Sequence, residues 1–178
     1  MVAPIAGGTV ESAIGIVQML EGRATYTGAA TGLYVIKTFT LDGEVQNPKG
    51  GQFTADAMLT ATFGGGGVPA ISHYSIVGSI KDFVNRDGRA IDSSWSVDLE
   101  TALFGSQQSG ALTGTNGNVF SGATEGDQDR MGAWSGRFFG DDTTSGNQST
   151  LPSAVAGTFD AQFTNGAVIG SFGAEKDD

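Results

Sequence analysis

Apolar and polar residues alternate with a period of two along most of this chain, which is the pattern of strands that bury one face. The clearest alternation runs from Phe53 to Phe63, where Phe, Ala and Leu occupy every second position and mostly polar residues lie between them. Each such run predicts a strand, and the first in the chain is long enough to be broken by a bulge or divided into two. The other runs of this kind cover residues 24–40, 74–84, 95–100 and 118–124.

Three later blocks combine glycine with aromatic residues: Gly132–Gly140, Ala156–Ala161 and Gly170–Ala174. We interpret them as further strands, which brings the total to about eight at spacings of roughly 8 to 20 residues, too short for intervening helices. A closed sheet of eight strands can fill its own interior with side chains. The sequence therefore predicts an all-β domain over residues 23–178, an eight-stranded antiparallel up-and-down β-barrel.

Residues 1–22 follow a different pattern. Apolar residues recur at helical spacing from Val10 to Leu20, after the candidate cap Thr9, which predicts a short amphipathic helix. The glycines at positions 7, 8 and 15 and the shortage of strong helix formers favour an extended linker instead. Both interpretations stay open on the sequence.

Glycine is abundant, with 29 residues in a chain of 178, against only 4 prolines. The length suits one domain, and the glycines do not recur at every third position as they do in collagen. A transmembrane barrel needs an apolar outside and a polar inside, so the strand pattern favours a soluble barrel. Small residues occur beside large ones at the predicted inward positions, which indicates a narrow, packed lumen: Ala55, Ala57, Gly78, Gly157 and Gly170 beside Phe53, Phe159 and Phe172.

The formal net charge of -10 disfavours nucleic acids and anionic membrane surfaces as partners, because both require clustered Lys and Arg. The absence of cysteine excludes disulfides, thiolate metal sites and a lipid-bearing cysteine within this sequence. The first 20 residues lack the basic start and apolar run of a signal peptide, and no stretch approaches the ~20 apolar residues of a spanning helix. If the protein is exported, we expect its targeting region to lie upstream or to have been removed.

The glycine and aromatic blocks also carry a family resemblance. Trp134–Gly140, Val155–Phe159 and Val168–Lys176, with the earlier Ala24–Gly28 and Ile76–Phe83, resemble the carboxy-terminal barrel of transferrin-binding protein B-like lipoproteins, from about Gly22 to the end of the chain. The residues that carry this fold motif are Gly136, Gly140, Gly157, Phe159, Gly170, Phe172 and Gly173.

That resemblance implies an eight-stranded barrel at the outer-membrane surface of a Gram-negative bacterium or secreted from it. It also implies the binding of a protein or an iron-bearing ligand, and so a role in iron acquisition. These 178 residues carry neither the handle domain that precedes the barrel in that family nor its lipid-bearing cysteine, which departs from the family pattern. The shared motifs are strand and turn residues, so they carry the barrel rather than a ligand site.

His73 is the single histidine, which excludes a multi-histidine metal cluster or relay. It is a candidate axial ligand for haem, with Met19, Met58 or Tyr74 as the second ligand. A structural histidine in a loop or at a strand edge is the favoured alternative. We therefore expect neither a metal nor a cofactor, with haem as the minor alternative.

Acidic residues give the remaining candidate chemistry. Asp98 and Glu100 lie two apart on one predicted strand face, the spacing at which two carboxylates meet one glycosidic bond. A solvated strand face is the favoured explanation. The loops Glu125–Asp129 and Gly140–Asp142 have a composition suited to calcium but lack the spacing of an EF-hand, and Gly64–Gly67 lacks the Lys-Ser/Thr of a phosphate-binding loop. No catalytic constellation emerges, and we expect a protein that is not an enzyme.

Protein binding is the leading functional expectation. Trp134, Phe138 and Phe139 cannot all point inward, because neighbours on a strand alternate, so one ring is a candidate contact on the surface or under the first 22 residues. The alternatives are a module that assembles into a surface array or fibre through residues 1–22, and a carrier of haem or a small ligand. Binding is expected through the variable loops Asp42–Gly51, Gly64–Pro69, Asn85–Asp92, Gly105–Gly117 and Gly140–Pro152.

Overall fold

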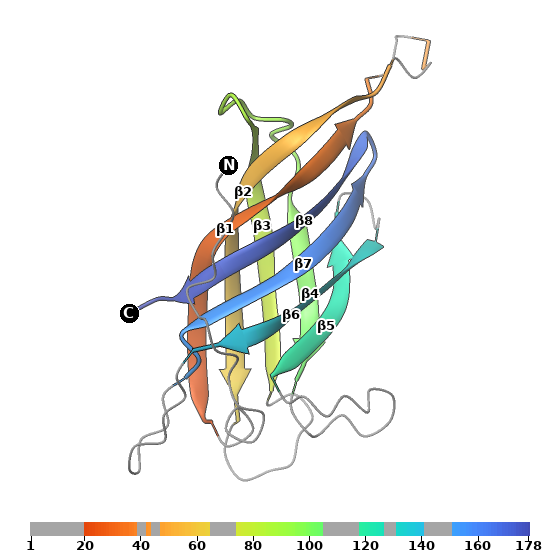
Figure 1. The fold of residues 1–178 in the computed structure, drawn as a ribbon. Coiled ribbons are helices and arrows are strands. Elements are labelled where there is room, and N and C mark those ends of the chain that lie inside the picture. The colour runs from red at the N-terminus through yellow and green to blue at the C-terminus, as the bar shows by residue number, and fades with distance from the viewer. Residues whose placement is uncertain are drawn as a thin grey trace.

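A computed structural model describes residues 20–38, 42–43, 47–64, 74–104, 118–126, 131–140 and 151–178. Within these segments each strand pairs antiparallel with its neighbour in sequence, and the pairing of the last strand with the first closes the barrel (Figure 1). The predicted all-β, eight-stranded up-and-down barrel is confirmed. The strands are β1 (Gly22–Ile36), β2 (Lys49–Phe63), β3 (Ser75–Asn85), β4 (Val97–Leu103), β5 (Val119–Glu125), β6 (Met131–Phe139), β7 (Ala154–Phe163) and β8 (Gly166–Lys176).

The described part of the chain contains no helix that could cross a membrane. Of the amino-terminal segment predicted as a helix or a linker, residues 1–19 lie outside the described residues. Leu20 is completely buried, so the chain enters β1 against the core.

The strands bend at places that the sequence pattern does not reveal. β1 pairs with β2 over its whole length without a break, so the bulge or division expected in the first strand is absent. The ladder shifts instead between β2 and β3, where Asp82 adopts the left-handed φ of +57°, and again within β4 between Leu99 and Leu103. A bulge adds one residue to one strand and increases its local twist, which helps a short sheet to close.

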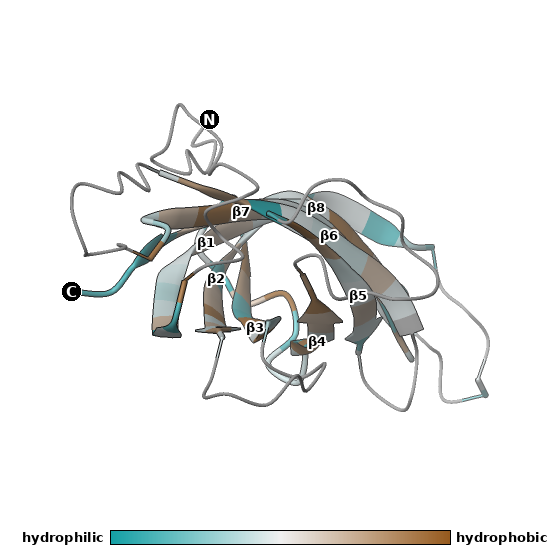
Figure 2. Cartoon of the chain, turned by 90° about the horizontal axis from the view of Figure 1, so that it is seen from below, coloured by the Kyte–Doolittle hydropathy of each residue, from teal (hydrophilic) through white to brown (hydrophobic). Residues whose placement is uncertain are grey.

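The core fills the lumen. The six alternate residues of β2 from Phe53 to Phe63 are at most 4% exposed, as the alternation predicts, while Met58 between them is 55% exposed. The cartoon coloured by hydropathy shows the same mixture of apolar and polar positions along the strands (Figure 2). The interior of the described barrel therefore holds the apolar side chains, and the outer wall of the described strands holds mostly polar and small ones.

Glycines make room for the aromatic rings inside. Four inward glycines lie directly opposite a ring on the neighbouring strand. A Cβ placed on three of them would lie 2.6–2.7 Å from the facing ring, and on the fourth it would lie 2.9 Å from Phe53 and 3.1 Å from the facing ring. A side chain at any of the four positions would collide with a ring, and at three of them it would lie closer still to a backbone carbonyl oxygen. The pairs are Gly122 with Trp134, Gly136 with Phe120, Gly157 with Phe172, and Gly170 with Phe159.

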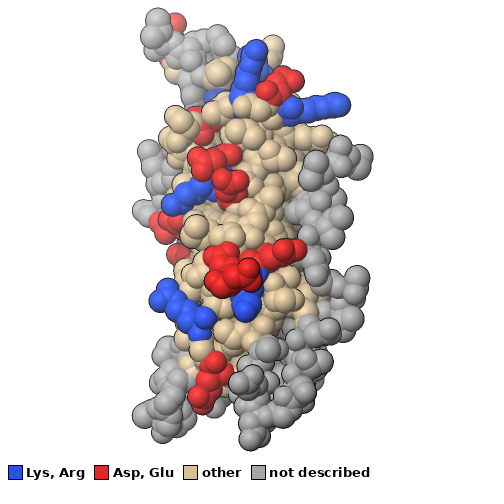
Figure 3. All heavy atoms as spheres, turned by 90° about the vertical axis from the view of Figure 1, so that its left-hand side faces the viewer, with Lys and Arg blue, Asp and Glu red and all other residues tan. Residues whose placement is uncertain are grey.

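Charged side chains of both signs lie interspersed on the outer face that Figure 3 shows, separated by uncharged surface. The large apolar residues that are exposed on the described strands are few: Leu33, Val35, Met58, Val77 and Ile169.

Candidate functional site

The predicted interaction residues Trp134, Phe138 and Phe139 all lie on β6. Trp134 and Phe138 point into the barrel and are 2% and 0% exposed, so both belong to the core. The ring centroid of Phe138 lies 4.8 Å from that of Phe104. Phe139 faces the other side of the strand and is half-buried. Of the three rings, Phe139 is the one that presents part of its surface outside the lumen.

The five loops expected to bind a partner divide between the two ends of the barrel. The connections containing Asp42–Gly51 and Asn85–Asp92 join strands at the upper end in Figure 1, while Gly64–Pro69, Gly105–Gly117 and Gly140–Pro152 join strands at the lower end. Nearly all residues of the three lower loops lie outside the described residues. The strand ends that carry the five loops are thus divided between the two ends of the barrel.

The acidic pair Asp98 and Glu100 lies on the exposed outer face of β4. Among the described residues no group of three His, Cys, Asp or Glu side chains is placed to hold a metal ion. His73 and Met19 lie outside the described residues. Met58 is exposed on the outer wall. The ring of Tyr74 makes an edge contact with that of Phe104, with 5.9 Å between the ring centroids. The structure thus brings none of the described candidates for catalysis or haem binding into a shared cavity.

A stacked pair of rings closes the upper end. Trp95 stacks on Phe163 with a centroid distance of 4.3 Å and an interplanar angle of 5°. The indole N–H of Trp95 donates to Oδ1 of Asn165 at 2.8 Å, and the Asn165 amide donates to Oδ2 of Asp92 at 2.7 Å. Ser94 donates its hydroxyl and its backbone N–H to Oδ1 of the same carboxylate, and these bonds lower the pKa of Asp92.

A second group of rings fills the lower end. Phe63, Phe104 and Phe138 contact one another there with centroid distances of 4.8–5.3 Å. Tyr26 joins them and donates its hydroxyl to the carbonyl oxygen of Pro152 at 3.0 Å. Burial raises the pKa of Tyr26 well above its ordinary value. Both ends of the described lumen are therefore occupied by side chains.

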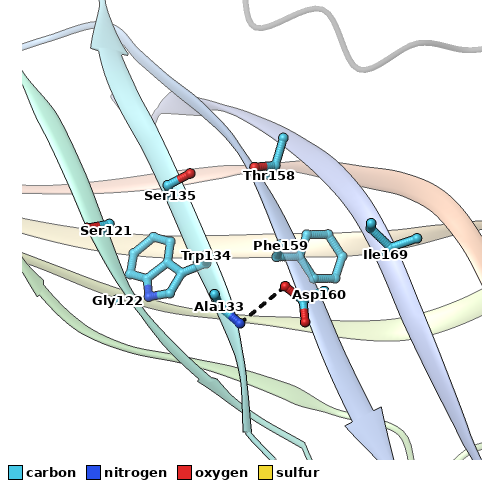
Figure 4. A pocket seen from close by; sticks show the side chains of 9 residues that line it. All are labelled: Ser121, Gly122, Ala133, Trp134, Ser135, Thr158, Phe159, Asp160 and Ile169. Atoms are coloured by element: carbon cyan, nitrogen blue, oxygen red, sulfur yellow. Dashed lines mark hydrogen bonds between the residues drawn. The ribbon is translucent and has the colours of Figure 1, made fainter.

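The described structure has a hollow on the outer wall of the barrel. It measures about 460 Å³ and opens across β5, β6, β7 and β8 (Figure 4). The outward residues that line it on β5 and β6 are Ser and Ala, which are smaller than Asp160 on β7 and Ile169 on β8. We call it the wall hollow; its outward lining residues are Ser121, Ala133, Ser135, Thr158, Asp160 and Ile169.

Gly132 sets the position of Asp160 in the wall hollow. A Cβ at Gly132 would lie 2.7 Å from both the Asp160 carboxylate and the Thr124 hydroxyl. Because this side chain is missing, Thr124 on β5 reaches past β6 and donates to the carbonyl oxygen of Asp160 at 2.5 Å. The Asp160 carboxylate lies against β6 and accepts the N–H of Ala133 at 3.3 Å, as Figure 4 shows.

The sequence pattern predicts neither the wall hollow nor the contact of Asn165 with Trp95 and Asp92. The outward Ser, Ala and Thr residues that form the hollow are typical of any solvated strand face, and they come from β5, β6 and β7, whose register the pattern does not give. Asn165 lies in a two-residue turn between β7 and β8, where asparagine is common for local reasons. Neither feature leaves a signal that a single sequence can distinguish from an ordinary barrel.

No protein-family model matches the sequence, and no curated protein matches it either.

Proposed function

We propose that this chain is a non-catalytic binding module that contacts a protein partner with its outside. The observation that carries the proposal is the filled lumen: ring clusters occupy both ends, so a partner meets the loops and the outer wall rather than the interior. Three loops leave the same, lower end between β2 and β3, β4 and β5, and β6 and β7. Loops gathered at one end of a rigid barrel are a common arrangement for recognition.

The proposal extends to the family. The strand motifs Trp134–Gly140, Val155–Phe159 and Val168–Lys176 that resemble transferrin-binding protein B-like barrels lie on or next to β6, β7 and β8. A member of that family would act at the surface of a Gram-negative bacterium or after secretion, and would bind a protein or an iron-bearing ligand. Antibody labelling of intact cells tests the location, and labelling only after the cells are lysed would contradict it.

Exchange of the loops tests binding directly. In one variant short Asn-Gly turns replace residues 65–73, 105–117 and 141–150 of the three lower loops, which leaves Leu151 and Pro152 in place. In a matched variant they replace residues 86–91 and the β1–β2 loop at the upper end. The isolated partner is then titrated by calorimetry against both variants and the parent protein. We expect the lower-end variant to lose binding while its midpoint of thermal unfolding stays unchanged. Equal affinity for all three proteins would refute binding through these loops.

Assembly is the second candidate function. Leu33 on β1 and Ile169 on β8 lie directly opposite each other across the closing pair of strands, and they are 57% and 62% exposed. Exposed apolar residues side by side on a wall suit contact with another copy of the chain. Sedimentation velocity over a hundredfold concentration range tests this, with Leu33→Ser as the comparison. A single monomeric species throughout would exclude assembly through this surface.

A further inference from the structure

The wall hollow combines one negative charge with hydroxyl groups. Its lining carries the carboxylate of Asp160 and the hydroxyls of Ser121, Ser135 and Thr158, and no basic residue. The N–H of Ala133, at 3.3 Å, is the one donor to this carboxylate among the described residues. All of these oxygens can accept further hydrogen bonds from a bound group, so the hollow suits a ligand rich in donors.

Among the described residues of the surrounding strands, no basic side chain is placed beside Asp160. On β6 the nearest basic residue is Arg137, four positions from Ala133 and so about 13 Å along the strand at ~3.3 Å per residue. Arg137 also has an interaction of its own. On β5 the outward charged residue is the acidic Glu125, and on β8 Glu175 and Lys176 stand at the far end of the strand from Ile169. The charges of the described residues around the wall hollow therefore favour a cation.

Two apolar side chains, Ile169 and Leu33, lie beside the carboxylate of Asp160. Ile169 on β8 is the cross-strand partner of Asp160 on one side and of Leu33 on the other, so acid, isoleucine and leucine form a row across three strands. Arg and Lys side chains have an apolar stem and a charged tip, and they bind where an apolar surface lies next to an acceptor. In the same way, the row places the apolar side chains of Ile169 and Leu33 next to the carboxylate of Asp160.

We propose that the wall hollow binds an arginine or lysine side chain of a protein partner, with its charged tip at Asp160 and its stem over Ile169. This inference rests on the proposed function, because it names the chemistry of one contact made by the partner. The net charge of -10 supports it, since the field of the whole protein attracts basic partners. A planar guanidinium suits the site better than an ammonium, because it can donate to Asp160 and to the Ser135 or Thr158 hydroxyl together.

The test uses a small probe, so it does not depend on the native partner. The peptide N-acetyl-Leu-Arg-amide is titrated into the ¹⁵N-labelled full chain, and the amide shifts of Ala133, Ser135 and Ile169 are followed. We expect saturable shifts at these positions with a millimolar dissociation constant that weakens at high salt. The matched peptides with Gln or Glu in place of Arg should give at least fivefold weaker binding.

Three variants give the controls. Asp160→Asn should weaken binding at least fivefold, and Ile169→Ser, an exposed substitution with little risk to folding, should weaken it as well. Asp98→Asn removes an exposed acid on β4 outside the hollow and should change nothing. Equal shifts in the parent and in Asp160→Asn, or no saturation, would overturn the inference. Shifts at these positions that follow protein concentration without the peptide would show instead that a second copy covers the hollow.

The two proposals fail separately. Loss of partner binding in the lower-loop variant, with no peptide binding at the wall hollow, would leave the proposed function intact and remove this inference. Peptide binding that depends on Asp160, together with unchanged partner affinity in every loop variant, would place the contact on the wall and remove the loop proposal.

Discussion

The packing of rings over glycines predicts a large cost for one added methyl group. A Cβ at Gly122 would lie 2.6 Å from Nε1 of Trp134, and ordinary contact begins near 3.4 Å, so the indole must retreat by about 0.8 Å. The same Nε1–H donates to the carbonyl oxygen of Glu100 at 3.0 Å. That carbonyl lies where β4 and β5 fall out of register, so the indole supplies a donor where the ladder is irregular.

We expect Gly122→Ala to lower the free energy of unfolding by about 1–3 kcal/mol. Overpacking typically costs about that much. Stretching the indole hydrogen bond adds up to ~1 kcal/mol to this cost. Alanine also restricts the unfolded chain more than glycine does, which offsets the cost by about 0.5–1 kcal/mol. For a chain of this size the midpoint of thermal unfolding should fall by roughly 2–12 °C.

A double-mutant cycle with Trp134→Phe isolates the proposed clash. Phe has no atom that corresponds to the indole Nε1, so Gly122→Ala should cost at least ~1 kcal/mol less in that background. The assay is urea unfolding followed by far-UV circular dichroism. Gly50→Ala on the outer side of β2, where the Cβ meets only the Tyr34 carbonyl at 3.1 Å, is the control and should change stability little. The same cost for Gly122→Ala in both backgrounds would refute the account.

Three further predictions concern the bulge and the two ends. Because Asp82 has a φ of +57°, Asp82→Val should destabilise the fold by about 1–2 kcal/mol in urea unfolding while Asp82→Asn should not; equal effects would argue against strain at the bulge. Asn165→Asp removes the donor to Asp92 and places two carboxylates together, so it should cost about 2–3 kcal/mol at pH 7 and less at pH 4. Unfolding of this variant is followed by the fluorescence emission of Trp95 at both pH values. The same loss in free energy of unfolding at pH 7 and pH 4 would contradict the contact between Asn165 and Asp92. In the unfolded chain the Tyr26 phenol ionises near pH 10, whereas in the folded protein burial keeps it protonated at that pH. The free energy of unfolding should therefore fall by up to ~1.4 kcal/mol for each pH unit above 10. Tyr26→Phe should flatten that fall and cost about 1 kcal/mol at neutral pH, whereas parallel pH curves would exclude the burial effect.

Phe138 and Phe139 show what strand periodicity predicts about candidate contact residues and what it does not. The alternation states that the two rings face opposite sides, and the structure has Phe138 in the core and Phe139 half-buried outside. The pattern could not say which ring is inside, because each of the two faces of β6 carries an aromatic or a small residue at most positions. Closure of the barrel decides it, since Phe138 meets the rings of Phe63 and Phe104 from β2 and the end of β4.

The sequence by itself determined the class of fold and, for the strands with the clearest alternation, which face is buried. Side-chain direction in a strand alternates without reference to any partner, so residues 53–63 reveal their own buried side. The mixture of small and large inward residues likewise indicates a narrow lumen, because volume is a property of each residue alone.

What only the tertiary structure decided was which residues meet. The pairing of Gly122 with Trp134 depends on the register of β5 and β6, and the row of Asp160, Ile169 and Leu33 depends on the closure of β8 onto β1. A shift of one residue in register would turn each strand's inward set outward, so these contacts arise from pairings among strands distant in the chain. The wall hollow is therefore a property of the closed barrel, and none of its residues is distinctive in the sequence.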